Sequence, residues 1–232
     1  MRRAFRILGT VLVVGGVLTL VWAAVVWRWQ DPFTALYTHW QQGKLATEYD
    51  HRAAAFRPLR AGSLAAERRA IAREAKSYRK ASGRGDAIGR IRIPRMGVVM
   101  VLVNGTDHDT LKKGPGRDLR TFMPGENRLV YIAGHRTTYL APFSHIDRLH
   151  RGDRVTIEVP YGTFVYSVTG HRIVVATDLS VLRSPTHELL ELQACHPRFF
   201  ATHRYIAYAK LVRVAPRGGP AYTLPNAIAA AP

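Results

Sequence analysis

The chain has 232 residues, 47% of them hydrophobic, which suffices for one globular domain with accessory segments and leaves little room for two. Lys and Arg outnumber Asp and Glu by 34 to 16, but much of this excess lies between residues 52 and 95 and no nucleic-acid-binding motif accompanies it, which argues against a nucleic-acid partner. A single cysteine excludes an internal disulfide and a cysteine-based metal cluster.

The first feature along the chain is an uncharged, mainly apolar run over residues 7–27, about as long as a helix that crosses a bilayer. Arginines precede it at positions 2, 3 and 6, and tryptophans crowd its far end at positions 22, 27 and 29. Positive charge before a span keeps the N-terminus in the cytoplasm, and Trp suits the outer interface. We therefore expect a cytoplasmic tip (1–6), a transmembrane anchor (7–27) and an extracellular remainder. A cleaved signal peptide is the alternative, which the length of the run and the lack of an Ala-x-Ala site disfavour.

Residues 28–85 are predicted to be a basic helical linker. Within it, residues 33–50 form a short amphipathic piece that lies on the membrane or packs on the following domain. One side of this piece carries Leu36, Tyr37 and Trp40. Residues 63–80 are rich in Ala, Glu, Arg and Lys, which favours a solvated helix or stalk. Contact of its charges with a polyanionic wall or with lipid headgroups is the alternative.

Beyond a glycine-containing boundary at residues 82–86 the pattern changes to β-strands. Strand-like segments follow at 88–93, 97–103, 128–133, 154–159, 163–176, 189–194 and 205–214, with a short helical piece at 107–113. Apolar residues alternate with period two in several of them, and turn residues separate them. This spacing predicts a mainly β domain over 86–215, with seven or eight strands in a closed or nearly closed barrel. The Pro-, Gly- and Ala-rich tail, 216–232, is predicted to be disordered.

The cysteine, Cys195, ends one of these segments and is followed by His196 and Pro197. Because proline cannot donate into a central ladder, the strand should stop near Cys195 and leave the thiol among the loops. A thiol that acts at neutral pH needs a base or a cationic neighbour, since the thiolate is the nucleophile. A structural role is the alternative, because free cysteine is among the most buried residue types.

Of the ten histidines, His135 is the best candidate for the base because it follows another strand-like run and a glycine. We therefore expect His135 and Cys195 at the same end of the barrel. His196 is nearer in sequence, but successive side chains of a strand point to opposite faces. Arg204, at the start of the next strand, is the predicted donor to a developing oxyanion, with Arg198 as its rival. No H-E-x-x-H pattern occurs, so neither a catalytic metal nor a cofactor is predicted.

Two segments resemble the sortases, most closely the class E group of Gram-positive, actinobacterial-type bacteria. Residues 133–139 (AGHRTTY) are similar to the strand-end histidine motif of the family, and residues 195–206 to its Cys and Arg segment. The resemblance implies an eight-stranded sortase-type β-barrel and a cysteine transpeptidase that cleaves a C-terminal LAxTG- or LPxTG-like signal between Thr and Gly. A surface protein bearing the signal would pass to an amine of a peptidoglycan precursor at the cell membrane.

Carried onto this chain, the resemblance implies that the Cys195 thiolate attacks the threonine carbonyl and forms a thioacyl intermediate. His135 protonates the leaving amine, and Arg204 holds the substrate or the oxyanion. Tyr139 resembles a class E tyrosine that favours Ala over Pro in the signal. The family usually reads Thr-Leu-x-Thr before Cys, whereas this chain reads ELQA. Since the residue before the cysteine commonly helps to bind the signal or oxyanion, Ala194 is a substrate-binding position at which altered efficiency or specificity is expected.

Two other functions are compatible with the sequence. A cysteine hydrolase on the same barrel would share every motif and would differ in releasing its product to water. A membrane-tethered, polybasic wall-binding or scaffold protein would carry an inert Cys195, and the net charge of +18 and the missing threonines favour it. The second alternative predicts that Cys195→Ala leaves every phenotype unchanged.

Overall fold

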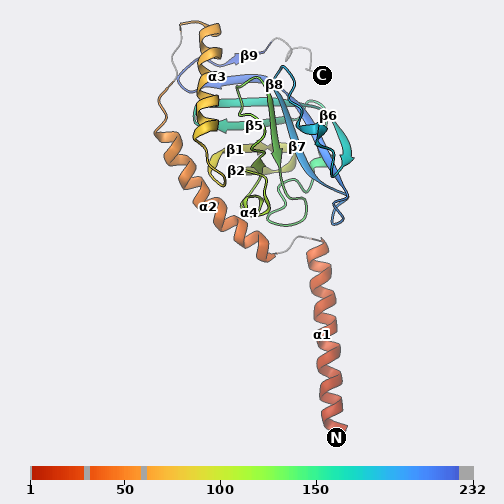
Figure 1. The fold of residues 1–232 in the computed structure, drawn as a ribbon. Helices are drawn as coiled ribbons and strands as arrows, with labels where there is room; N and C mark the ends of the chain where they lie inside the picture. The colour runs from red at the N-terminus through yellow and green to blue at the C-terminus, as the bar shows by residue number, and fades with distance from the viewer. Residues whose placement is uncertain (1, 29–31, 59–61, 225–232) are drawn as a thin grey trace.

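The computed structural model describes residues 2–28, 32–58 and 62–224. Its first helix, α1 (Arg2–Arg28), stands clear of the rest of the chain (Figure 1). The stretch Arg2–Val25 is long and apolar enough to cross a membrane, and none of it is buried. The side chains of Trp27 and Trp29, expected at the outer interface, lie outside the described part of the structure.

In the described residues, eight strands close into a barrel (Figure 1). They are β1 (Ala87–Ile93), β2 (Val98–Asn104), β3 (Gly116–Arg117), β4 (Leu129–Ala133), β5 (Arg154–Val159), β6 (Gly162–Val175), β7 (Leu189–His196) and β8 (His203–Pro216). The hydrogen-bonded order is β6-β5-β1-β2-β3-β4-β7-β8, and pairing of β8 with β6 completes the ring. The short helix α4 (His108–Leu111) follows β2. This architecture confirms the predicted mainly β, eight-stranded barrel.

The strands β4 and β7 are parallel neighbours, although about sixty residues separate them in the chain. Their register runs from Leu129 opposite Leu189 to Ala133 opposite Gln193. Because parallel strands end at the same edge of a sheet, the residues that follow β4 and those that end β7 meet at one end of the barrel. Strand β8 lies antiparallel on the other side of β7.

Alternate residues of β7 point into the barrel and out of it. Leu190, Leu192 and Ala194 belong to the interior core. A second apolar cluster lies on the outer face and includes Tyr131 and Val181. Val181 comes from the 3-10 turn η3 (Leu179–Leu182) in the connection between β6 and β7, so this connection covers part of the outer face of β4 and β7. The two faces of this part of the sheet are therefore both shielded from solvent.

Two helices of the linker pack against the barrel. Helix α2 (Pro32–Ala54) buries Leu45 and Tyr49 against the strand region, and α3 (Leu64–Ala81) buries Ile71 and Ala75 in the main core. The free, solvated stalk predicted for residues 63–80 is therefore not what the structure shows. The reason is an apolar stripe with helical spacing, Ile71, Ala75 and Tyr78, within an otherwise charged segment.

The tail also differs from expectation. Residues Tyr222–Thr223 form a short strand, β9, that pairs with β8, and the side chain of Leu224 packs on the core. The guanidinium of Arg68 lies 5.1 Å from the ring centre of Tyr222. These apolar contacts order the first part of a segment predicted to be disordered from residue 216. Residues 225–232 lie outside the described residues.

Candidate active site

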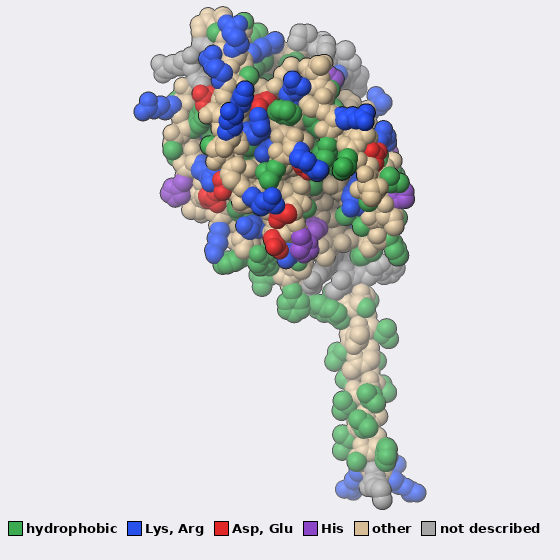
Figure 2. Space-filling view, viewed as in Figure 1, with side chains coloured by type: hydrophobic (Ala, Val, Ile, Leu, Met, Phe, Trp, Pro, Cys, Tyr) green, Lys and Arg blue, Asp and Glu red, His purple; other side chains and the backbone are tan. Residues whose placement is uncertain are grey.

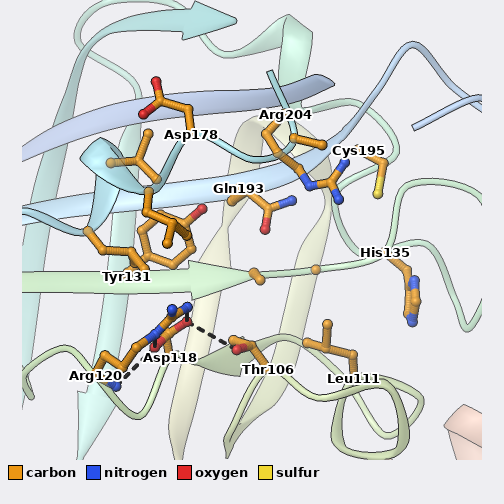
Figure 3. Close-up of a pocket in the computed structure, with 16 residues that line it drawn as sticks. Thr106, Leu111, Asp118, Arg120, Tyr131, His135, Asp178, Gln193, Cys195 and Arg204 are labelled. Atoms are coloured by element: carbon orange, nitrogen blue, oxygen red, sulfur yellow. Dashed lines mark hydrogen bonds and ion pairs between the residues drawn. The ribbon is translucent and has the colours of Figure 1, made fainter. Parts of the chain in front are cut away.

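A cavity of about 260 Å³ lies on the outer face of the sheet, at the carboxyl ends of β4 and β7 (Figure 3). Cys195, His135 and Arg204, the three residues predicted to carry the chemistry, all line it. Cys195 is half-buried, so its thiol is neither a core group nor freely exposed. The structure thus brings together residues that are up to 69 positions apart in the chain, from 135 to 204.

The strand register places Arg204 beside the cysteine. In the antiparallel pair of β7 and β8, Cys195 lies directly opposite Arg204. Side chains in such opposite positions leave the sheet on the same face, with Cβ atoms about 4.5–5.5 Å apart. The Nη1 atom of Arg204 donates to the carbonyl oxygens of Ala201 at 2.7 Å and His203 at 2.9 Å, which fixes the guanidinium. A rigid cation next to the thiol is suited to stabilise a thiolate or an oxyanion.

His135 reaches the same site from β4. The backbone N–H of Gly134 donates to the carbonyl of Gln193 at 3.0 Å, so the ladder between the two strands continues for one residue beyond Ala133. His135 therefore lies level with Cys195. Its ring points away from the thiol in Figure 3, and in the described part of the chain no hydrogen bond joins the two side chains. Hydrogen bonds between catalytic side chains often form only when substrate is bound. The orientation of the His135 ring is therefore compatible with a catalytic pair.

Burial tunes the His135 imidazole. The ring packs against Tyr139 in a tilted arrangement, with 5.1 Å between centroids, and its Nε2 atom is buried without a hydrogen-bond partner among the described residues. Burial lowers the pKa of His135 below its usual 6.5, and the nearby His108 lowers it further. The imidazole is therefore neutral at pH 7 and able to accept a proton.

Tyr139, predicted to bind the substrate, does not line the cavity. It begins a turn in which Tyr139, Leu140 and Ala141 all have positive φ values, of 53°, 60° and 37°. The turn is closed by a hydrogen bond from the Ala141 N–H to the Thr138 carbonyl at 2.8 Å. Left-handed backbone costs a non-glycine residue roughly 1–2 kcal/mol, so this turn needs support from its surroundings. It directs the tyrosine ring onto His135 on one side and toward helix α2 on the other.

Ala194, the other predicted substrate-binding residue, is also placed differently. Its side chain is fully buried in the interior core of the barrel. The physical reason is the alternation of the strand, because a thiol at position 195 that faces outward requires position 194 to face inward. A substrate-binding role for the Ala194 side chain does not fit this position. The side chain that lines the cavity from β7 besides Cys195 is Gln193, and the same period-two argument applied to the sequence would have identified it.

Arg136 is a residue of this site to which the sequence analysis gave no role. Only 5% of its side chain is exposed, and its Nη1 atom donates to the carbonyl oxygen of Cys195 at 3.2 Å. The same nitrogen lies 3.0 Å from Nδ1 of His196, and Nη2 pairs with Asp147 at 3.1 Å. The side chain next to His135 is thus fastened to the backbone of Cys195. No periodicity or turn signal predicts the burial of this guanidinium.

The walls of the cavity differ in chemistry. Apolar side chains line it from the connection after β6 and from α4; they are Leu111, Leu179, Val181 and Leu182. The floor carries Tyr131 and Gln193, and at the far end Arg120 pairs with Asp118 at 2.7 Å. A cavity with an apolar side wall and polar groups along two strands suits an extended peptide with at least one apolar side chain.

Glu191 lies on the same strand, two residues before Gln193. It is 4% exposed, and its Oε2 atom is buried without a partner among the described residues. Burial raises the pKa of Glu191 to about 8. The side chain is therefore protonated at neutral pH. It places a buried acid at the position where the family that the sequence resembles usually has threonine.

The rival residues from the sequence lie elsewhere. Arg198 does not line the cavity, and its guanidinium lies 5.9 Å from the ring centre of Phe199. His196 contacts Arg136, and His171 stacks on Tyr205 at 4.8 Å. Within residues 2–28, 32–58 and 62–224, His, Cys, Asp and Glu form no group of three or more that would hold a metal ion.

Comparison with known proteins agrees with this geometry. The family model for the Sortase domain matches residues 91–212. The chain is 35% identical over 133 residues to Sortase D of Bacillus subtilis, an alignment that covers 55% of this chain and 65% of that protein. It is 28% identical over 149 residues to Sortase SrtE1 of Streptomyces coelicolor, covering 57% of this chain and 42% of the relative. The chain thus spans less than two thirds of either relative.

Solved structures show the same fold. A Clostridium perfringens Sortase D5 transpeptidase superimposes with a TM-score of 0.60 at 27% identity, covering 74% of this chain and 98% of that one. Sortase E1 from Streptomyces coelicolor, solved with a tripeptide in its active site, gives a TM-score of 0.55 at 26% identity, covering 64% and 99% of the two chains.

Proposed function

Because this chain belongs to the sortase family, we propose that it is a membrane-anchored cysteine transpeptidase. It would cleave a C-terminal LAxTG- or LPxTG-like sorting signal between Thr and Gly and transfer the protein to an amine of a cell-wall precursor. One observation carries the proposal: Cys195 lies opposite Arg204 in the β7–β8 register, and His135 continues the neighbouring parallel strand into the same cavity.

The first half of the reaction forms a thioester. The Cys195 sulfur attacks the threonine carbonyl carbon while neutral His135 takes the thiol proton, and Arg204 stabilises the negative charge that develops on the carbonyl oxygen. The C–N bond to glycine then breaks, and His135 returns its proton to the leaving amine. The lowered pKa of His135 keeps the imidazole in its neutral, proton-accepting form at pH 7. It favours the second transfer, because the imidazolium is a stronger acid than an unperturbed one, and it makes the imidazole a weaker base in the first.

The second half reverses these steps with another amine. The incoming amine attacks the thioester carbonyl, His135 removes its proton, and the thiol is released as the new amide bond forms. The protein's residues do the same work in both directions, so the identity of the acceptor decides whether the outcome is transfer or hydrolysis. A hydrolase would use this site unchanged with water as the acceptor.

The sorting signal of the substrate would lie along the outer face of β4 and β7. Gln193 and Tyr131 offer hydrogen bonds to an extended backbone, and the apolar wall that includes Val181 and Leu182 offers a surface for the leucine of the signal. Tyr139 is expected to act on specificity only through His135, since it lies outside the cavity.

The anchor in this proposal is α1. Its span is preceded by three arginines at positions 2, 3 and 6, which favours a cytoplasmic N-terminus and a barrel on the outer side of the membrane. That location brings the cavity to both proposed substrates, a secreted protein held at the membrane and a wall precursor.

The test uses the full chain in detergent micelles with fluorogenic LAxTG and LPxTG peptides, with and without a glycine-oligomer amine. Cleavage between Thr and Gly, with a ligated product in the presence of the amine, supports the proposal. Release to water alone supports the hydrolase. No cleavage by a folded chain, or cleavage that persists in Cys195→Ala, contradicts both. A fragment that begins after α3 is unsuitable, because Ile71 and Ala75 of this helix belong to the core.

A further inference from the structure

The first turns of α2 carry an exposed apolar stripe. Phe33, Leu36, Tyr37 and Trp40 are 73%, 71%, 40% and 54% exposed. Their spacing, i, i+3, i+4 and i+7, places them on one side of the helix. We refer to these four residues as the α2 stripe. Exposed aromatic and aliphatic side chains gathered in this way mark an interaction surface more often than isolated ones do.

The α2 stripe is not the side of the helix that packs on the barrel. That side carries Thr38, Leu45 and Tyr49, all buried, and the Thr38 hydroxyl donates to the Lys112 carbonyl at 2.7 Å. The carboxamide of Gln42 both donates to the Val101 carbonyl, at 3.1 Å, and accepts from the Val101 N–H, at 2.7 Å. Most of the packing of α2 on the barrel therefore comes from residues outside the stripe, although Tyr37 also contacts Tyr139.

The α2 stripe begins close to the end of α1. Only residues 29–31 separate the two helices in the chain, and the rings of Trp22 and Phe33 lie 5.6 Å apart. Figure 2 shows apolar side chains gathered at the base of the barrel, beside the upper end of α1. The Nζ atom of Lys44 lies 3.5 Å from the centre of the Trp40 ring, so a cation borders the aromatic surface. Trp, Tyr and Lys in this arrangement are typical of the headgroup level of a membrane.

We propose that the α2 stripe lies in the outer interface of the same bilayer that α1 crosses, with lipid headgroups and the upper acyl chains as its partner. This inference rests on the proposed membrane anchoring. It adds a second membrane contact, which fixes the orientation of the barrel instead of leaving it tethered at one point.

The contact would reach the active site through two aromatic rings. The ring centre of Tyr37, in the α2 stripe, lies 6.5 Å from that of Tyr139, and the Tyr139 ring packs against His135 with 5.1 Å between centroids. The backbone N–H of Tyr139 also donates to the Thr34 hydroxyl of α2 at 3.2 Å. A helix held at the membrane surface therefore supports the turn that carries Tyr139. The cavity is held near the lipid surface, where a membrane-bound acceptor amine would be found.

The depth of Trp40 tests the proposal. A full-length variant with Trp22, Trp27 and Trp29 changed to Phe keeps Trp40 as the sole tryptophan. It is reconstituted in phosphatidylcholine–phosphatidylglycerol vesicles with lipids brominated near the top of the acyl chain. We expect Trp40 to lose about half of its emission to the bromines, as an interfacial residue does. Flotation with the vesicles checks the anchor separately.

A matched pair of substitutions on α2 provides the control. Leu36→Asp places a charge in the stripe and should abolish most of the quenching, while the chain still floats through α1. Thr47→Asp, at an exposed position three turns beyond Leu36 along the helix, should leave the quenching unchanged. Both side chains are exposed, so circular dichroism should show the same fold for both.

The outcomes separate the two proposals. A chain that does not float overturns the anchoring and the inference with it. A chain that floats but shows a water-like, unquenched Trp40 overturns the inference alone. A shielded yet unquenched Trp40, accompanied by crosslinks between chains, shows that a second copy covers the stripe and also overturns it.

Discussion

The proposed nucleophile and the proposed base are held in place by different parts of the structure. Cys195 lies inside a ladder, paired across β7 and β8 with Arg204. His135 lies beyond the end of β4, in a connection held by a backbone hydrogen bond from the Phe143 N–H to the His135 carbonyl at 3.0 Å and by the side chains of Arg136 and Tyr139. Ladder hydrogen bonds fix a backbone within a cooperative sheet, whereas a connection of this kind can shift when one side chain changes.

This difference suggests a division of labour. The thiol and the guanidinium form a fixed pair, while the imidazole is adjustable and, under the proposed mechanism, turns toward the thiol during the reaction. Changes on the β7 side should therefore act on the chemistry or on global stability. Changes around His135 should act on its position and its pKa.

Cys195→Ala is the change with the largest expected effect. Under the proposed mechanism it removes the group that forms the covalent intermediate, so the cleavage rate of a sorting peptide should fall by about 10³-fold or more. Stability should hardly change, because the thiol is half-buried and lies outside the interior core of the barrel. Peptide turnover and thermal melting measure the two effects. Residual cleavage at more than a few per cent would mean that another residue is the nucleophile.

Arg136→Gln tests whether the His135 connection is held by side chains. It removes the hydrogen bond to the Cys195 carbonyl and the pair with Asp147, so His135 should lose its position. We expect kcat to fall by up to about 10²-fold with little change in KM, since small misplacements of a catalytic group have large effects. Stability should fall by about 1–3 kcal/mol, because buried partners lose a hydrogen bond.

Asp147→Asn is the matched control for this change. The Asp147 side chain is 53% exposed, so its loss should have a much smaller effect on stability and rate. Arg136→Lys should restore part of kcat. If Arg136→Gln loses stability but keeps kcat, the residue has a structural role alone.

Glu191→Gln tests the β7 side through stability and not through rate. Burial raises the pKa of Glu191 from 4.5 to about 8, so the folded protein binds this proton more tightly than the unfolded chain does. Stability from this group is present below pH 4.5 and is lost as the pH rises toward 8. Gln does not titrate, so the variant should gain about 1–3 kcal/mol relative to the parent between pH 5 and pH 8. Melting temperatures at the two pH values measure this gain.

The surroundings of Glu191 define the control. The charge of Glu191 raises the pKa values of Tyr131 and Tyr208, and the charge of Arg172 lowers the pKa of Glu191. Arg172→Gln should therefore raise the pKa of Glu191 further and extend the loss of stability to higher pH. A pH-independent difference between Glu191→Gln and the parent would show that the acid is not titrating in this range.

The barrel was predictable from the sequence because alternation and turn residues report directly on strands. The predicted segment 154–159 coincides with β5, and the others lie close to the observed strands. Strands as short as β3 and β9 carry too few residues for alternation to appear. The apolar stripe of α3, at Ile71, Ala75 and Tyr78, is visible in the sequence, but the many charged residues around it favoured the prediction of a solvated helix.

The candidate site was predictable only where a side chain's direction follows from its place in a strand. The end positions of Cys195 and His135 followed from the strand pattern, whereas the pairing of β4 with β7 joins segments sixty residues apart and leaves no local trace. Ala194 was assigned to the cavity although alternation placed it in the core. The contacts of Arg136 arise from a connection whose path no propensity specifies.

Tyr139→Ala has the smallest expected effect. It tests most directly whether His135 is held differently from Cys195. Removing the ring exposes His135 to water, so the pKa of His135 should rise toward its usual 6.5. An NMR titration of the imidazole measures this rise directly. Under the proposed mechanism neutral His135 accepts the thiol proton, so the acid limb of kcat/KM should move to higher pH by the same amount.

Tyr37→Ala provides the matched control for this last change. It removes the ring on the α2 side of Tyr139 but leaves the stack on His135, so the pKa should move less than in Tyr139→Ala. If both variants leave the titration midpoint unchanged, the burial of His135 comes from the strands and not from the connection. His135 and Cys195 would then be held in the same way, and the difference between an adjustable base and a fixed nucleophile would disappear.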